Sequence, residues 1–204
     1  MVPMMRTYLV ALSLTVLPLV AHAQDSAQVK KLFEAGQYEK VIDAAQSTGG
    51  GPDVVYAAAQ SAQKLGNNDT AREFYNRLSA LPEDDAWHSI GLSGLRLLDD
   101  QIDAARAAAQ QAATQHGEEI PEAYFQLGLV LAKQQDWSGA AAAFDRAAEL
   151  NPTFAYAHYY AGLMHYRANR PDRMANRFDQ FLKLAPNAPE RPEVMQIMRT
   201  VRGR

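Results

Sequence analysis

Histidine is the residue type in this chain best suited to acid–base or metal chemistry, and two histidines share one face of an expected helix. His158 and His165 are seven residues apart, which on a helix rising about 1.5 Å per residue corresponds to ~10.5 Å. A single metal ion cannot bridge that distance. We therefore expect both rings to pack between helices rather than to form a metal site.

The other polar clusters also suggest structural roles. Asp84-Asp85 and Asp99-Asp100 stand where helices are expected to begin or turn, and these positions favour Asp because its carboxylate accepts hydrogen bonds from free backbone N–H groups. The glycines at residues 49–51 are not followed by the Lys and Ser or Thr of a phosphate-binding loop. The absence of cysteine excludes thiolate catalysis and zinc–thiolate sites. We expect no enzymatic activity, no bound metal and no cofactor.

Charge restricts the class of partner. The formal net charge of −3 argues against a nucleic-acid partner, because proteins that neutralise phosphates carry a basic surface. The distribution is uneven, since basic residues outnumber acidic residues nine to four between positions 167 and 204. Such a run is typical of a solvated face, and the alternative is a basic end that steers an acidic partner.

The first 23 residues have the composition of an export signal. Arg6 precedes an apolar run over residues 8–20, and Ala21-His22-Ala23 supplies the small residues of a cleavage site. The run is shorter than the roughly 20 residues that a membrane-spanning helix needs. We expect a signal peptide at residues 1–23, cleavage before Gln24, no membrane insertion of the mature chain, and a periplasmic or secreted location. A retained membrane anchor is the alternative.

The helices that must position any binding residues are indicated by a sequence motif that recurs after 34 residues. Phe144-Asp145, Leu150 and Pro152 return as Phe178-Asp179, Leu184 and Pro186. Within each unit, apolar residues recur at spacings of three and four, which indicates amphipathic helices. A polar break such as Gln135-Asp136 divides the unit in two, and two helices joined by a short turn form an antiparallel hairpin. Units begin near residues 52, 86, 121 and 155.

This pattern resembles the tetratricopeptide repeat (TPR) family, whose signature is an aromatic residue, Leu-Gly and a large residue on the first helix, then Ala, an aromatic residue and a closing Pro. The unit from Pro121 carries every element, as Tyr124, Leu127-Gly128, Leu131, Ala140, Phe144 and Pro152. The unit from Ala155 departs from the pattern at Met174, where a small residue is usual. The resemblance implies an all-α, right-handed α-solenoid of stacked antiparallel helix hairpins. Stacking is needed because one hairpin cannot bury its own apolar face.

The expected domain organisation follows the repeat. A TPR-like array covers residues 24–189, with about five units near 24–51, 52–85, 86–120, 121–154 and 155–189. A C-terminal capping helix occupies residues 190–204, because Val194, Ile197, Met198 and Val201 form one apolar stripe.

In TPR proteins the first helix of each unit lines a concave groove, so the resemblance implies a binding surface there. The predicted peptide-binding groove consists of Tyr56, Trp87, Ile90, Phe125, Leu129, Tyr156, Tyr159, Tyr160 and Tyr166. Aromatic rings with a polar tip suit a partly hydrated binding surface, and the alternative is that some of them pack against a neighbouring helix or the C-terminal cap. Some TPR proteins grip a peptide carboxylate with Lys, Asn and Arg. The matching positions here hold Tyr56, Gln60, Gly91, Glu122 and Gln126, which disfavours that mode.

The resemblance therefore favours a non-catalytic scaffold that binds a peptide or protein segment in its groove. The alternative is a structural subunit of an envelope assembly that contacts partners through its convex face or its basic C-terminal end, where Arg191, Arg199, Arg202 and Arg204 lie. The sequence identifies neither the partner nor the oligomeric state.

Overall fold

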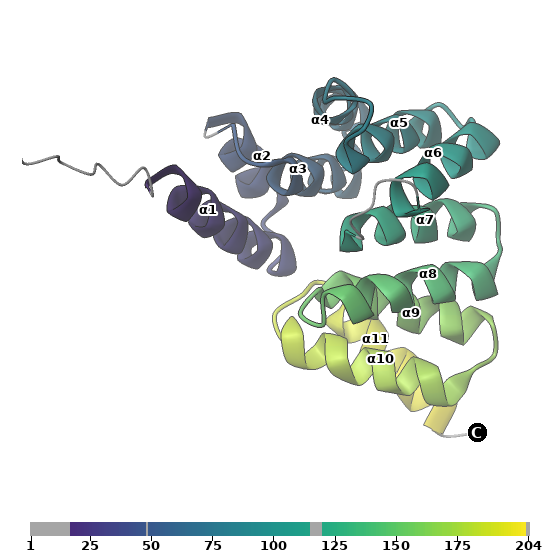
Figure 1. Ribbon diagram of the computed structural model, residues 1–204. Coiled ribbons are helices and arrows are strands. Elements are labelled where there is room, and N and C mark those ends of the chain that lie inside the picture. The colour runs from purple at the N-terminus through teal and green to yellow at the C-terminus, as the bar shows by residue number, and fades with distance from the viewer. Residues whose placement is uncertain (1–16, 48, 115–119, 203–204) are drawn as a thin grey trace, which may run out of the picture.

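The computed structural model describes residues 17–47, 49–114 and 120–202, and every regular element in these ranges is an α-helix. The helices pair in chain order into hairpins, and a single helix follows the last pair (Figure 1). The pairs are α1 (Leu17–Glu34) with α2 (Tyr38–Ser47), α3 (Pro52–Lys64) with α4 (Asn68–Ser79), α5 (Ala86–Leu98) with α6 (Ile102–Thr114), α7 (Pro121–Lys133) with α8 (Trp137–Leu150), and α9 (Ala155–Arg167) with α10 (Pro171–Leu184), and α11 (Arg191–Arg202) comes last. The expected all-α solenoid of stacked hairpins is confirmed.

The N-terminal part of the chain is described only in part. Residues 1–16, which form most of the expected signal peptide, lie outside the described residues, and α1 begins at Leu17. Of the helices within the described ranges, none combines the length and the apolar character needed to cross a membrane.

Each hairpin turns at a residue in the left-handed region of backbone conformation. These residues occupy equivalent places in the five turns and are Gly36 (φ 70°), Gly66 (φ 74°), Asp100 (φ 56°), Gln135 (φ 62°) and Asn169 (φ 55°). The following N–H donates to a carbonyl five residues back, as from Asn67 to Ala62 at 2.8 Å and from Asp136 to Leu131 at 3.0 Å. This bond satisfies a carbonyl that the end of the helix would otherwise leave free. The turn predicted at Gln135-Asp136 is confirmed.

Short polar side chains begin several helices. The Asp85 carboxylate accepts the Trp87 N–H at 2.8 Å, and the Asp136 carboxylate accepts the Gly139 N–H at 2.9 Å. Both bonds satisfy N–H groups that have no partner within the helix. The structural roles predicted for the two acidic pairs are therefore confirmed at Asp85, which caps a helix, and at Asp100, which forms a turn.

Glycines on the first helices set how closely the two helices of a unit approach. A Cβ atom built on Gly128 would lie 2.7 Å from the Phe144 ring, and one built on Gly162 would lie 2.4 Å from the Phe178 ring. Both rings are fully buried. The recurring Gly and Phe of the repeat thus form the same packing contact in two successive units. A larger residue in place of either glycine would overpack that contact.

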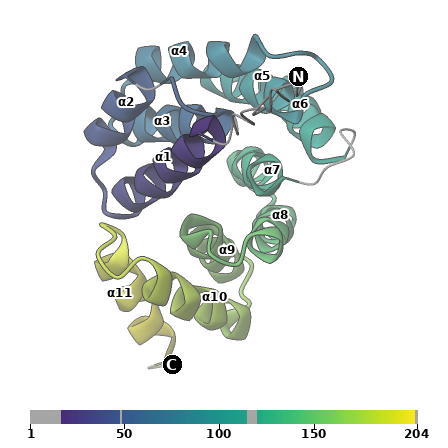
Figure 2. The same ribbon diagram turned by 60° about the vertical axis from the view of Figure 1, so that its left-hand side comes forward.

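The array curves until its first unit meets its last. Figure 2 shows the helices following an arc from α1 to α10, with the loop before α11 approaching the first hairpin. Four contacts join the first three helices, α1 to α3, to the segment from the α8–α9 connection onward, and we call them the closure contacts. They are Lys30 Nζ to Thr153 Oγ1 at 2.8 Å, the Phe33 and Tyr156 rings with centroids 4.9 Å apart, the Tyr38 and Tyr156 hydroxyls at 3.4 Å, and Lys64 Nζ to Glu190 Oε1 at 2.7 Å. The concave side is therefore bridged by contacts between early and late parts of the chain.

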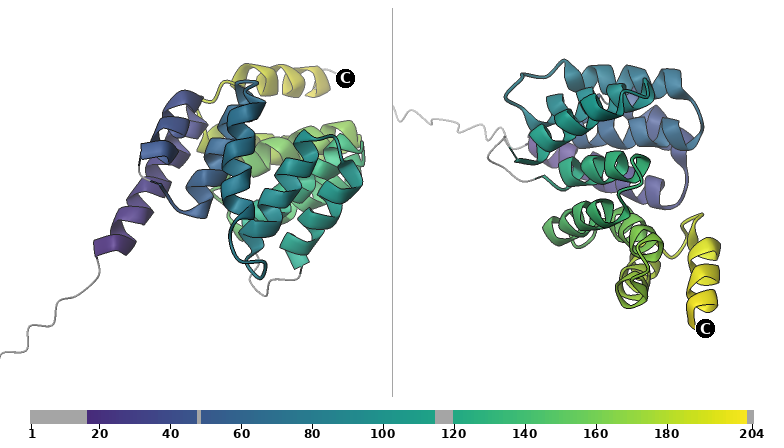
Figure 3. Two further views of the ribbon diagram at one scale, coloured as in Figure 1. Left: turned by 90° about the horizontal axis from the view of Figure 1, so that it is seen from above. Right: turned by 90° about the vertical axis from the view of Figure 1, so that its right-hand side faces the viewer.

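The capping helix is present. α11 lies at the edge of the array beyond α9 and α10 (Figure 3), with Val194 and Met198 buried and Met195 exposed. Arg191 and Arg199 face solvent, so the helix covers the apolar end of the stack with one face and presents a polar face to water, as a solenoid requires.

Candidate binding site

A partly open cavity of about 360 Å³ lies on the concave side and is lined by α1, α3, α7, the connection from α8 to α9 and the start of α9. Its volume falls within the range of pockets that take small ligands or side chains. The residues that line it are Ser26, Ala27, Val29, Lys30, Phe33, Glu34, Asp53, Val54, Tyr56, Ala57, Gln60, Glu122, Phe125, Asn151, Thr153, Phe154 and Tyr156.

Aromatic rings form much of the cavity wall, and they are held rigidly by contacts with one another. Phe125 stacks on Phe154 with centroids 4.9 Å apart, and Phe33 meets Tyr156 edge to face. The Tyr56 hydroxyl donates to Gln126 Oε1 at 3.0 Å, and the fully buried Gln126 in turn donates to Ser93 Oγ at 3.2 Å. The wall is therefore preformed, since each ring is fixed by neighbours from another helix.

Charged groups line the same cavity. Asp53 lies in the first turn of α3 and Glu122 in the first turn of α7, where the helix dipole favours negative charge. Burial raises the pKa of Glu122, and the nearby charge of Asp53 raises it as well. Burial also raises the pKa of Glu34. Glu122 and Glu34 are thus both partly desolvated, and Glu122 also faces the like charge of Asp53.

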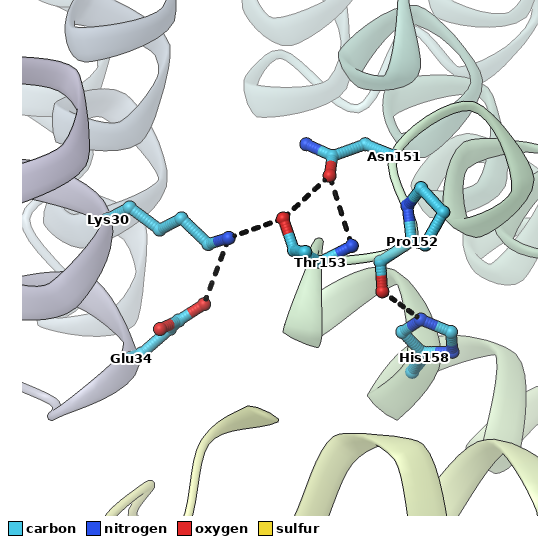
Figure 4. Close-up of polar contacts among 6 residues, drawn as sticks. All are labelled: Lys30, Glu34, Asn151, Pro152, Thr153 and His158. Atoms are coloured by element: carbon cyan, nitrogen blue, oxygen red, sulfur yellow. Dashed lines mark hydrogen bonds and ion pairs between the residues drawn. The ribbon is translucent and has the colours of Figure 1, made fainter. Parts of the chain in front are cut away.

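Lys30 is the basic residue of the cavity wall, and it is already engaged (Figure 4). Its ammonium donates to Thr153 Oγ1 at 2.8 Å and lies 3.9 Å from a Glu34 carboxylate oxygen. Asn151 Oδ1 accepts from both the N–H and the hydroxyl of Thr153, which fixes the hydroxyl that Lys30 contacts. Lys30 therefore fastens α1 to the α8–α9 connection at the side of the cavity.

A second cluster lies next to the cavity, where Lys64 meets the tyrosines of α9. The Lys64 ammonium is 5.2, 5.9 and 5.6 Å from the ring centroids of Tyr156, Tyr159 and Tyr160, respectively. Burial alone would lower the pKa of Lys64, but Tyr160 and the Glu190 carboxylate raise it overall. The ammonium is therefore held in its charged form among three rings that attract cations.

The hydroxyl groups of these tyrosines bind the C-terminal segment. Tyr156 donates to Glu190 at 2.8 Å and Tyr159 donates to Glu193 at 2.9 Å. Burial, reinforced by the adjacent carboxylates, raises the pKa of both tyrosines. They are therefore neutral donors at physiological pH, and the cap is anchored through them.

The structure brings three of the nine predicted groove residues together in the cavity wall, namely Tyr56, Phe125 and Tyr156. Trp87 packs against Tyr56 and is partly buried, and Leu129 is partly buried against the core. Ile90 is completely buried. Tyr159 and Tyr160 surround Lys64, and Tyr166 is exposed.

The two histidines both pack between helices, as expected. His158 Nε2 lies 3.0 Å from the Pro152 carbonyl oxygen, and burial lowers the pKa of its ring. His165 Nε2 lies 2.9 Å from Oδ2 of Asp145, and Arg177 Nε donates to the other carboxylate oxygen, Oδ1, at 2.7 Å. In the described ranges, no group of three or more His, Cys, Asp or Glu side chains could hold a metal ion.

Sequence reasoning missed Lys30, Phe33, Lys64, Glu190 and Glu193 as parts of the concave surface. Lys64 follows Tyr56 and Gln60 at intervals of four along α3, so helical periodicity alone could have placed it on the groove stripe. Glu190 and Glu193 each lie 34 residues after the tyrosine they contact. The 34-residue repeat period could therefore have paired Glu190 with Tyr156 and Glu193 with Tyr159.

Comparison with known proteins gives a consistent result. One tetratricopeptide repeat model matches residues 121–154, and a second tetratricopeptide repeat model matches residues 53–81 and 156–188. No curated protein matches the chain significantly.

Similar solved structures include TTC0263, a thermophilic TPR protein of Thermus thermophilus, with a TM-score of 0.61 and 18% identity over 87% of this chain and 98% of that one. The Cut9–Hcn1 hetero-tetramer of APC/C aligns with a TM-score of 0.57 and 16% identity over 81% of this chain and 33% of that one. MamA aligns with a TM-score of 0.49 and 22% identity over 72% of this chain and 84% of that one. Residues 53–81, 121–154 and 156–188 are thus tetratricopeptide repeats, and the chain folds as a TPR solenoid.

Proposed function

We propose that the protein is a non-catalytic interaction scaffold that holds a segment of a protein partner in the concave cavity. The observation that carries the proposal is the cavity itself. It lies on the side where first helices face inward, and its wall includes Tyr56, Phe125 and Tyr156. Rigid aromatic walls with a few polar groups are characteristic of binding pockets. The TPR fold supports the same class of function, since TPR arrays bind protein segments.

The proposal includes export to the periplasm or the cell exterior. Its support is the N-terminal pattern of one basic residue, an apolar run and Ala21-His22-Ala23. Cleavage before Gln24 would remove the start of α1 and leave every residue that lines the cavity, because the first of these is Ser26.

Filling the cavity tests the scaffold function. Ala57 lines the cavity, and Ala57→Trp would place an indole in the space where a partner segment should lie. The matched control is Ala107→Trp, at an exposed position of α6. Partners would be captured in the native host by chemical crosslinking and identified by mass spectrometry. We expect crosslinked partners for the wild type and the control and their loss for Ala57→Trp, while equal partner sets in all three folded proteins would reject the cavity as the binding site.

A structural role through the C-terminal end is the second candidate, favoured by the exposure of Arg191, Met195 and Arg199 on α11. Reversing two charges, Arg191→Glu with Arg199→Glu, tests it without removing the contacts that Glu190 and Glu193 make. Loss of partners in this variant, with no loss in Ala57→Trp, would favour the structural role over the scaffold.

A further inference from the structure

We propose that the cavity is a receptor for a lysine or arginine side chain of the bound segment, with Asp53 and Glu122 as the counter-ions. This inference rests on the proposed function, because it takes the ligand to be a protein segment. It adds the chemistry that the segment must present, which neither the fold nor the repeat pattern specifies.

The first support is an acidic pair without a cation. Asp53 and Glu122 both line the cavity, and within the described ranges the structure gives neither carboxylate an ion pair with a basic side chain. They come from the first turns of two different helices, α3 and α7. Two like charges facing a partly desolvated space repel each other, and a cation placed between them would relieve that repulsion.

The second support is the charge balance of the whole wall. Glu34, Asp53 and Glu122 contribute three carboxylates, and Lys30 contributes one ammonium. That ammonium donates to Thr153, as one of the closure contacts, and also pairs with Glu34 of its own helix, as Figure 4 shows. The cavity therefore retains an excess of negative charge, which attracts a basic group and disfavours a carboxylate or a phosphate.

The third support is the aromatic lining. Phe33, Tyr56 and Phe125 offer apolar area for the methylene stem of a Lys or Arg side chain and π surfaces for its charged end. The chain uses the same chemistry beside the cavity, where the Lys64 ammonium lies among three tyrosine rings and 2.7 Å from Glu190. Tyr156 belongs to both places. The structure thus contains, beside the cavity, an occupied example of the contact that the cavity offers to a ligand.

The experiment uses an array of synthetic 12-residue peptides of randomised sequence and the full mature chain. The tightest-binding peptide is then compared in solution, by fluorescence polarisation, with an analogue in which each Lys is replaced by norleucine and each Arg by citrulline. We expect selected peptides to be enriched in Lys or Arg, and we expect the analogue to bind at least tenfold more weakly to the wild-type protein.

The acidic pair is tested by the double variant Asp53→Asn with Glu122→Gln, which keeps side-chain size and removes two charges. We expect this variant to bind the basic peptide about tenfold more weakly and to bind the analogue as the wild type does, so that the difference between the two peptides disappears. The matched control is Glu39→Gln with Asp43→Asn, which removes two exposed charges from α2, away from the cavity, and should keep the full difference.

The outcomes separate the two proposals. If no peptide binds, or if Ala57→Trp binds every selected peptide as the wild type does, the scaffold proposal fails and this inference fails with it. If peptides bind, are lost on Ala57→Trp, and bind as tightly without their basic groups, only the inference is overturned. The affinities of the peptide and its analogue for the wild-type protein test whether a basic side chain is required, even if the double variant does not fold.

Discussion

Tyr156 and Lys64 meet across the concave face, with the Lys64 ammonium 5.2 Å from the centre of the Tyr156 ring. The two residues belong to α9 and α3 and are joined further by Glu190, which accepts a hydrogen bond from the Tyr156 hydroxyl at 2.8 Å and pairs with Lys64 at 2.7 Å. Three distant parts of the chain, α3, α9 and the segment before α11, therefore meet at one ammonium group. Three tyrosine rings of the last repeat, those of Tyr156, Tyr159 and Tyr160, thus lie around one cation.

Removing that ammonium should weaken the whole fold. Lys64→Met keeps most of the stem and leaves the Glu190 carboxylate, whose side chain is 11% exposed, without its cation. We expect the free energy of unfolding to fall by about 1–2 kcal/mol, because a partly buried charge loses its partner. Urea denaturation measures this, and Lys40→Met, at an exposed position of α2, should change the free energy by less than about 0.5 kcal/mol.

The Asp145 cluster should make the stability depend on pH. Burial alone would raise the pKa of Asp145, but the hydrogen bond from His165 and the charge of Arg177 lower it overall. Because its pKa is lower in the folded state, its contribution is present above the ordinary value of 3.8 and is lost as the pH falls through the folded pKa. We expect Asp145→Asn to lower the free energy of unfolding by about 2 kcal/mol at neutral pH.

The same variant should show a weaker dependence on pH below 3.8 than the wild type, as followed by urea denaturation at several pH values. Asp172→Asn at an exposed position of α10 is the control. Equal slopes for Asp145→Asn and the wild type in this acidic range would contradict the role given to the cluster.

Two hairpin turns allow substitutions that should have opposite effects on stability. Gly66 has φ of 74°, and a Cβ atom built on it meets nothing within 4 Å. Gly66→Ala should therefore lower the free energy of unfolding by about 1 kcal/mol, because a residue with a Cβ atom is disfavoured in the left-handed backbone conformation. Gln135 adopts φ of 62° in the equivalent turn. Gln135→Gly should therefore raise the free energy of unfolding by about 0.5 kcal/mol or more, because glycine adopts this conformation without strain. Thermal unfolding followed by circular dichroism measures both, and changes of the same sign would contradict the explanation.

Export predicts a defined mature N-terminus. Expression of the full chain in a bacterial host, followed by fractionation and intact-mass measurement, should give a periplasmic or secreted protein that begins at Gln24. Replacing Ala23 with a large residue, as in Ala23→Leu, should block cleavage. Recovery of the uncut wild-type chain in the cytoplasmic fraction would count against the signal peptide.

Much of the fold could be predicted because its signals are local. Apolar residues at spacings of three and four predicted the helices, and Gln135-Asp136 marked a turn. The 34-residue period indicated which contact recurs, as with Gly128 on Phe144. These features depend on residues within one helix hairpin or on its repetition in the next.

The enclosure of the concave side could not be predicted in the same way. The hydrogen bond from Lys30 to Thr153 joins residues 123 apart, and whether such residues meet depends on the summed curvature of every unit between them. For this reason the sequence predicted Tyr156 as part of a partly hydrated groove, whereas the structure buries it to 1% exposure against Phe33, Tyr38 and Lys64. Tyr56 and Ile90 are buried as well, and Tyr56 contacts Tyr75, Trp87 and Gln126 of other helices.

The closure contacts also bear on how fast a partner can bind. The bond from Lys30 to Thr153 joins two parts of the cavity wall, so we expect a single side chain to enter with this bond intact and a longer segment to require that α1 separate from the α8–α9 connection. Association would then include a conformational step slower than diffusional encounter. Weakening that bond with Thr153→Ala should raise the association rate constant for long peptides and leave that for short ones unchanged.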